Sequence, residues 1–232
     1  MHLSLILGLL IAWGAERTAD TILAEDYHQW TLTKAVEVLN DSPWARHETF
    51  TRIVGGVGSG ISGEKEIYNT FYVRFLSARP IREAYARIQQ IRHGYDDMSS
   101  EEKLRFDQAQ LPKLDIDVED WIVVCLSFRS NDPNEESSVR RFLHSETVRT
   151  LKTKAFLSTP ESPQVEIAAY FPPIEESVGA KFVFPREING KPVISKNGQR
   201  ITFELLEVPG AQPRLRATFT VKAMLHDGNL IL

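Results

Sequence analysis

The sequence has only one cysteine, which excludes an intramolecular disulfide, so the fold must be stabilised by its core. Cys125 lies in the apolar run 121–126, and such a short continuous run is typical of a buried strand. A reactive thiol needs partial exposure and a nearby positive group, whereas a buried thiol behaves as a small hydrophobic side chain. We therefore expect Cys125 to be structural.

The sequence also has no excess of positive charge. The net charge is -4 and the isoelectric point is about 5.9, and no stretch of the chain concentrates lysine and arginine. Proteins that bind nucleic acid need a positive field along the phosphate backbone. Nucleic acid is therefore excluded as an expected partner. The apolar share of 42% and the charged share of 25% are typical of a chain that folds around a core.

Familiar catalytic and cofactor motifs are missing. The six histidines are scattered, and none forms the His-Glu-x-x-His spacing of a metal site. The glycine-rich segment 58–63 has dinucleotide-type spacing, but a strand rather than a helix is predicted after it. Glu64 stands where a phosphate-binding loop needs lysine. Asp115, Asp117 and Glu119 would share one face of an extended chain, yet they lack the spacing of a calcium loop. We expect no cofactor and no metal.

What is present begins with an apolar segment at the N-terminus. Residues 3–12 are almost entirely apolar, and a run of this length is too short to cross a bilayer. Small residues follow it, which predicts a signal peptide over 1–15 and export to the periplasm or the extracellular space. The mature chain is then expected to have no transmembrane span. The usual basic residues before the apolar run are missing, so the alternative is a buried N-terminal helix or strand of a cytosolic protein.

Periodicity predicts helices and strands along the rest of the chain. Apolar spacing and capping residues predict four helices, near 31–40, 80–94, 99–111 and 133–143. Alternation predicts strands at 47–54 and 67–76, joined through the glycine segment as a hairpin. After Thr147 short strands follow one another, and Asn189-Gly190, Asn197-Gly198 and Asp227-Gly228 predict tight hairpins. Residues 215–223 give the clearest alternation.

These elements predict an α+β fold. We expect about eight to nine mostly antiparallel strands in a sandwich or partly open barrel, with about four helices packed toward the N-terminal two-thirds. Residues 16–232 are predicted to form a single module. A sub-boundary near 130–136, before a C-terminal β meander, is the alternative.

The sequence favours a non-catalytic binding or interaction module whose partner is a protein or a small molecule. Loops and clustered arginines place the expected ligand-binding site at Gly58, Gly60, Arg74, Arg79 and Arg82. Two alternatives remain open. An exported hydrolase would assemble its acid and base from Asp115, Asp117, His47 and His144. A carrier of a small apolar ligand would have a cavity lined by Phe71, Val73, Phe75, Phe219 and Val221.

Overall fold

The computed structural model describes residues 17–55, 64–174 and 179–232. The predicted signal peptide and the glycine segment with Gly58 and Gly60 lie outside these ranges. The helices are α1 (Ala19–Leu23), α2 (Leu32–Asn40), α3 (Arg79–Arg92), α4 (Ser100–Leu114), α5 (Pro133–Ser145) and α6 (Val148–Leu151).

The first sheet has five strands in the order β1-β2-β3-β7-β6. Its centre is β3, in which residues 122–126 around Cys125 are buried as expected, whereas Trp121 at the start of the predicted run is 42% exposed. β3 lies between β2 and β7, so chain segments on both sides of residues 130–136 share one sheet. The strands are β1 (Ala45–Gly55), β2 (Glu64–Phe75), β3 (Trp121–Ser130), β6 (Ala169–Phe171) and β7 (Ala180–Pro185).

The second sheet has four strands in the order β11-β10-β4-β5 and packs face to face on the first. The strands are β4 (Ala155–Ser158), β5 (Val165–Glu166), β10 (Arg200–Leu206) and β11 (Arg214–Thr220). Aromatic side chains join the two layers: the rings of Phe75 and Phe219 lie 4.7 Å apart, and those of Phe182 and Phe203 lie 5.3 Å apart. The alternating strands thus bury their inner faces in one shared core.

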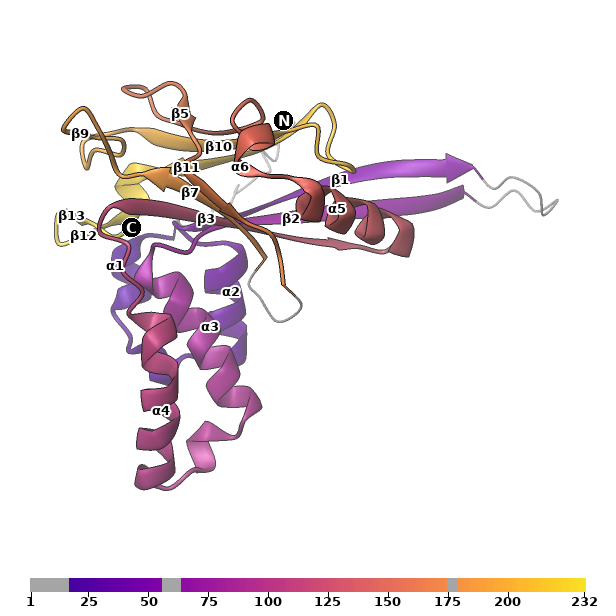
Figure 1. Ribbon diagram of the computed structural model, residues 1–232. Helices are drawn as coiled ribbons and strands as arrows, with labels where there is room; N and C mark the ends of the chain where they lie inside the picture. Colours follow the sequence, from indigo (N-terminus) through magenta and orange to yellow (C-terminus); the bar gives the residue numbers. More distant parts are fainter. Residues whose placement is uncertain (1–16, 56–63, 175–178) are drawn as a thin grey trace, which may run out of the picture.

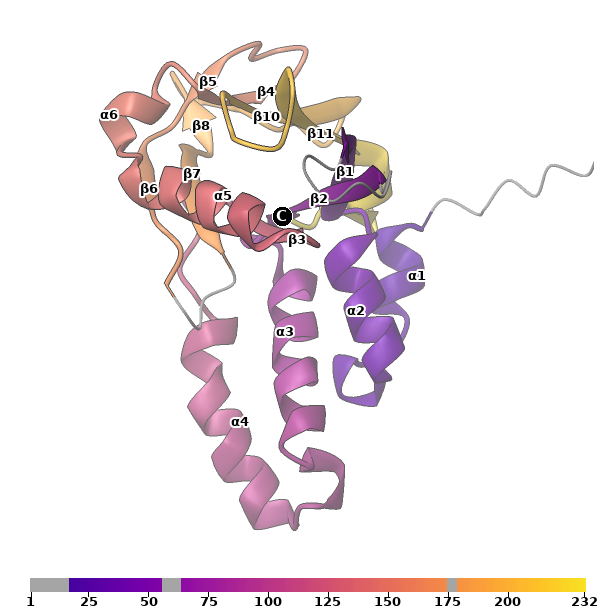
Figure 2. The same cartoon turned by 90° about the vertical axis from the view of Figure 1, so that its right-hand side faces the viewer.

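The helices cover the first sheet from the opposite side and from its end. α1 to α4 form a group below the sheets, and α3 and α4 extend furthest from them (Figures 1 and 2). α2 begins where the Thr31 side chain accepts a hydrogen bond from the Lys34 backbone, and Ser99 and Glu102 bond each other at the start of α4. No helix in the described ranges has both the length and the apolar character that a bilayer crossing requires.

The structure confirms the predicted α+β class. Every strand pair among the described residues is antiparallel, and the α-helices all lie before residue 152. The described residues contain thirteen strands rather than eight or nine, because two hairpins are made of two-residue strands. These are β8 (Glu187–Ile188) with β9 (Lys191–Pro192), and β12 (Leu225–His226) with β13 (Asn229–Leu230).

Two local predictions need correction. Asn189-Gly190 and Asp227-Gly228 form the expected hairpin turns with positive φ, but Asn197-Gly198 does not join paired strands. There the Gly198 backbone donates to the Ser195 carbonyl in a turn between β9 and β10, which pair with other strands. The predicted strand 215–223 ends earlier, because residues Val221–Met224 form a 3-10 helix.

Candidate functional site

The most prominent feature of the surface is the β1–β2 hairpin, which extends beyond the body of the molecule (Figure 1). We call its outer part, residues 49–55 and 64–70, the arm. The two strands pair without interruption from Ala45 with Arg74 to Gly55 with Glu64. Threonine, isoleucine, valine and aromatic residues favour extended backbone, which explains why the pairing continues past the core.

One face of the arm is fastened to the start of α5. Arg52 pairs with Glu135, and the Lys65 ammonium lies 2.8 Å from an Asp132 carboxylate oxygen. The Asn131 side chain accepts a hydrogen bond from the Tyr68 backbone N–H and donates one to the Glu66 carbonyl. These contacts begin at Lys65, next to the last described pair of the hairpin, and fasten the arm to the start of α5 along much of its length.

The buried Asn69 side chain completes this attachment. Its Nδ2 donates to Glu135 at 3.2 Å and to the Gly210 carbonyl at 3.4 Å. The arm is therefore linked to the β10–β11 connection as well as to α5.

The other face of the arm is open to solvent. Ile53 is 61% exposed and Tyr68 is 42% exposed, and alternation along the paired strands puts both on the face away from Arg52 and Lys65. Thr49 and Thr70 share a hydroxyl–hydroxyl hydrogen bond of 3.0 Å across the strands, and the Tyr68 hydroxyl donates to Glu66. Large apolar side chains gathered on a projecting element are typical of protein–protein contact surfaces.

The attachment of the arm should depend on pH. The hydrogen bond from Lys65 and the backbone N–H of Asn134 lower the pKa of the Asp132 carboxyl. A carboxyl with a lowered pKa in the folded state stabilises that state above its unfolded pKa, and the contribution is lost as pH falls through the folded value. We expect the difference in unfolding free energy between the wild type and Asp132→Asn to be present at pH 6–7 and to vanish in acid, because asparagine keeps the helix cap.

Urea denaturation between about pH 2.5 and 7 measures this difference. Lys65→Gln is the matched control, because it removes the other partner and should reduce the effect of Asp132→Asn at neutral pH. A difference that does not change with pH would show that the Asp132 charge does not hold the arm.

The predicted ligand-binding arginines have different surroundings. Arg74 is buried, and its guanidinium donates to the Leu39 carbonyl, the Asn40 side chain and the Ser127 hydroxyl. The Tyr72 ring also lies against it, 4.9 Å from the guanidinium carbon. These contacts attach α2 to the first sheet.

Arg82 and Arg79 lie on α3. Arg82 is buried, donates to the carbonyls of Leu76, Ser77 and Leu114, and has its pKa lowered by burial. Arg79 is exposed and pairs with Glu83 at 2.9 Å and with Asp115 at 3.8 Å. Two of the three arginines predicted to bind a ligand, Arg74 and Arg82, are therefore internal hydrogen-bond donors in the structure.

The residues of the hydrolase alternative have separate partners. His47 on β1 lies 3.1 Å from the Asn40 carbonyl, and His144 is exposed near the end of α5. Asp115 contacts Arg79, and Asp117 accepts a hydrogen bond from the Glu119 backbone. No interaction between an imidazole and a carboxylate of this set is found among the described residues.

The residues of the carrier alternative are packed. Each is at most 1% exposed. The Phe71 ring lies against Phe128 at a tilt, with ring centroids 4.6 Å apart, and Phe75 packs on Phe219 across the two sheets. All five residues belong to the hydrophobic core; they are Phe71, Val73, Phe75, Phe219 and Val221.

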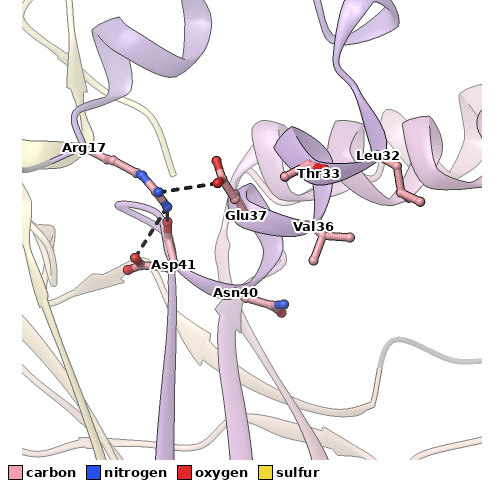
Figure 3. A pocket seen from close by; sticks show the side chains of 7 residues that line it. All are labelled: Arg17, Leu32, Thr33, Val36, Glu37, Asn40 and Asp41. Atoms are coloured by element: carbon pink, nitrogen blue, oxygen red, sulfur yellow. Dashed lines mark hydrogen bonds and ion pairs between the residues drawn. The ribbon is translucent and has the colours of Figure 1, made fainter.

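A surface depression of about 480 Å³ lies beside α2 (Figure 3). At one end Arg17 pairs with Glu37 at 3.7 Å and with Asp41 at 3.4 Å, and at the other Leu32 and Val36 are exposed. Arg17 is engaged by both carboxylates at one end, and the other end offers only a small apolar strip.

A second depression of about 510 Å³ lies between α1 and the β12–β13 hairpin. Asp20, His226 and Asp227 bring possible metal-ligand atoms within 4.8 Å of one another there. His226 Nδ1 lies 2.7 Å from an Asp20 oxygen, and this contact fastens α1 to β12. His226 and Asp20 already contact each other, so this group is explained as the contact that packs α1 against the β12–β13 hairpin.

Sequence reasoning missed the arm as a site. Alternation predicted both of its strands, but alternation is the same for a strand inside a sandwich and one that projects from it. The available signal in the sequence was that Ile53 shares one face of the predicted strand with Thr49 and Thr51, which are polar. The exposure of Ile53 is known only from the structure. A scan of protein-family models, a search of curated proteins and a search of solved structures each returned no match to this chain, so its function is argued from its geometry.

Proposed function

We propose that this chain is an exported, non-catalytic interaction module that contacts another protein through the arm. The observation that carries the proposal is the projection of β1 and β2 beyond the body (Figure 1), with Ile53 and Tyr68 exposed on one face. Burying such side chains contributes about 25 cal/mol for each Å² removed from water. Charged residues attach the opposite face to α5, so the exposed face is already oriented for contact.

The edge of the arm supports the same proposal. β1 is the first strand in the sheet order, and β2 is its only sheet neighbour among the described residues. An unpaired edge offers backbone donors and acceptors to an added strand, which is a common mode of protein recognition.

Photo-crosslinking tests the proposal. A photoreactive amino acid at Ile53, in a chain produced in its own host, should give discrete crosslinked protein species, because the side chain would lie against the partner. The matched control is Leu104 on α4, which is 59% exposed and lies away from the arm. Equal crosslinking from both positions, or none from Ile53, would contradict the proposal.

Export is the second half of the proposal. It rests on the apolar segment 3–12, and the intact mass of the same host-produced chain tests it. Removal of about fifteen N-terminal residues is expected; retention of all of them would contradict export.

A further inference from the structure

The backbone pattern of β1 determines which of its groups face outward. The Phe75 N–H donates to the Trp44 carbonyl at 2.9 Å, so residue 44 directs its backbone toward β2. Ala45, one residue later, exchanges both of its hydrogen bonds with Ser42 on the other side. Because backbone direction alternates in an antiparallel strand, His47, Thr49, Thr51 and Ile53 direct their N–H and C=O groups to the outer edge.

This edge lacks several of the features that protect edge strands. Natural edges are protected by charged side chains, above all lysine, and by proline, bulges or short length. The charged residues of β1, which are Arg46, Glu48 and Arg52, are of both signs, so they disfavour only those registers that place like charges opposite each other. β1 contains neither lysine nor proline, is 11 residues long and pairs with β2 without a bulge. Its side chains from His47 to Gly55 are exposed, with only Phe50 partly buried.

We propose that a second copy of this chain pairs with this edge, β1 against β1 in antiparallel direction, with the two Phe50 residues opposite each other. The inference rests on the proposed function and names the partner of the arm. In this register His47 lies opposite Ile53 of the second copy, and Thr49 lies opposite Thr51. Both pairs join residues with outward backbone groups, as hydrogen bonding requires.

Charge complementarity selects this register. Pairing about Phe50 places Glu48 opposite Arg52 of the second copy, and the two-fold symmetry makes this pair twice. A shift by one hydrogen-bonding step in one direction places Arg46 opposite Arg52, which is repulsive. A shift in the other direction places Glu48 opposite Val54. Only the register about Phe50 gives two opposite-charge pairs while it joins all four outward residues from His47 to Ile53; Ala45 stays bonded to Ser42.

The side chains are free to make these pairs. Glu48 is exposed, and Arg52 is 57% exposed while it contacts Glu135. A guanidinium has five N–H donors, so Arg52 can bind a second carboxylate. The arm extends away from the body (Figure 1). Antiparallel pairing of two arms would therefore place the two bodies at opposite ends of the paired strands. One strand pair is a small interface, so we expect dissociation on the order of micromolar.

Sedimentation velocity of the purified mature chain tests the pairing. The wild type should shift toward twice the mass of one chain as its concentration rises. Glu48→Arg should weaken this association by at least about tenfold, because each ion pair becomes a repulsive pair. Glu48→Arg with Arg52→Glu should restore it, because the charges are exchanged. Thr51→Pro should abolish it while keeping the pairing with β2, since the lost N–H faces outward.

A disulfide test reports the register. Cys125 is buried and is the only cysteine, so an introduced cysteine is the only accessible thiol. Phe50→Cys should oxidise to a linked dimer, because directly opposite residues lie within disulfide range. Ile53→Cys is the matched control: it is more exposed, but its expected neighbour is His47 of the second copy.

The outcomes separate this inference from the proposed function. A chain that stays monomeric at high concentration, or a dimer that Glu48→Arg leaves intact, would overturn β1 self-pairing. Faster oxidation of Ile53→Cys than of Phe50→Cys would also overturn it. Crosslinks from Ile53 to a different protein in a monomeric chain would overturn the inference and leave the interaction module in place. A monomeric chain that also gives no crosslinks from Ile53 would contradict both the self-pairing of β1 and the interaction module.

Discussion

Replacing Phe203 with alanine should lower the free energy of unfolding by about 3–5 kcal/mol. Phe203 is fully buried on β10, in the second sheet. Its ring packs edge-on against Phe182 and Phe184 of β7 in the first sheet, with centroids 5.3 and 6.3 Å away. Truncation would remove both contacts and leave a cavity between the sheets, which close packing prevents from collapsing.

Urea or guanidinium denaturation measures this loss. Phe171→Ala on β6 is the matched control, because the same side chain is 55% exposed there and should cost within about 1 kcal/mol. Equal losses at the two positions would show that the two sheets do not share the core on which the fold depends. If the unfolding free energy of one variant depends more steeply on denaturant concentration, the substitution has changed the unfolded state instead.

The elements that could be predicted from the sequence are those governed by local patterns. α2 begins after Thr31 because a threonine side chain can cap it, and α4 begins with the Ser99–Glu102 pair for the same reason. β1, β2 and β3 follow from alternation or from a continuous apolar run. These signals involve residues within a few positions of one another, so no knowledge of the tertiary structure is needed.

The burial of the arginines could not be predicted in this way. Arg82 binds the Leu114 carbonyl, thirty-two positions away, and Arg74 binds the Leu39 carbonyl, thirty-five positions away. Whether an arginine on a helix or a strand is buried depends on the segment that covers it, and that segment lies far away in the sequence. The prediction of a hairpin at Asn197-Gly198 was wrong for the same reason. Whether a turn joins paired strands depends on which other strands they pair with, and the local sequence does not show this.

The candidate site was hidden for a related reason. The glycine segment drew attention to the tip of the hairpin, whereas the structural argument rests on the strand edge and on Glu48, Phe50 and Arg52. Their symmetric spacing about one residue is visible in the sequence. This spacing indicates a pairing register only when β1 is known to be an edge strand and the residues with outward backbone groups are known.

Gly179→Ala should destabilise the fold by at least about 2 kcal/mol, since backbone conformation and space both exclude a side chain there. Gly179 has φ +117°, and a Cβ built on it would lie 2.2 Å from the Leu126 carbonyl oxygen and 2.7 Å from its carbon. Leu126 lies within β3 and pairs with Ala180, so the clash is with backbone in the centre of the first sheet. Relief would require β3 and β7 to separate at this point.

Two other glycines separate the two causes of this loss of stability, which are the backbone conformation and the lack of space. Gly190 has φ +72° but open space around it, so Gly190→Ala should show the conformational cost alone, about 1 kcal/mol. Gly55 has neither positive φ nor a neighbour within 4 Å, so Gly55→Ala should be nearly neutral. Thermal unfolding of the three variants should therefore rank them in this order. If Gly179→Ala costs no more than Gly190→Ala, the close approach to β3 is not required, and the start of β7 can move without loss of the sheet.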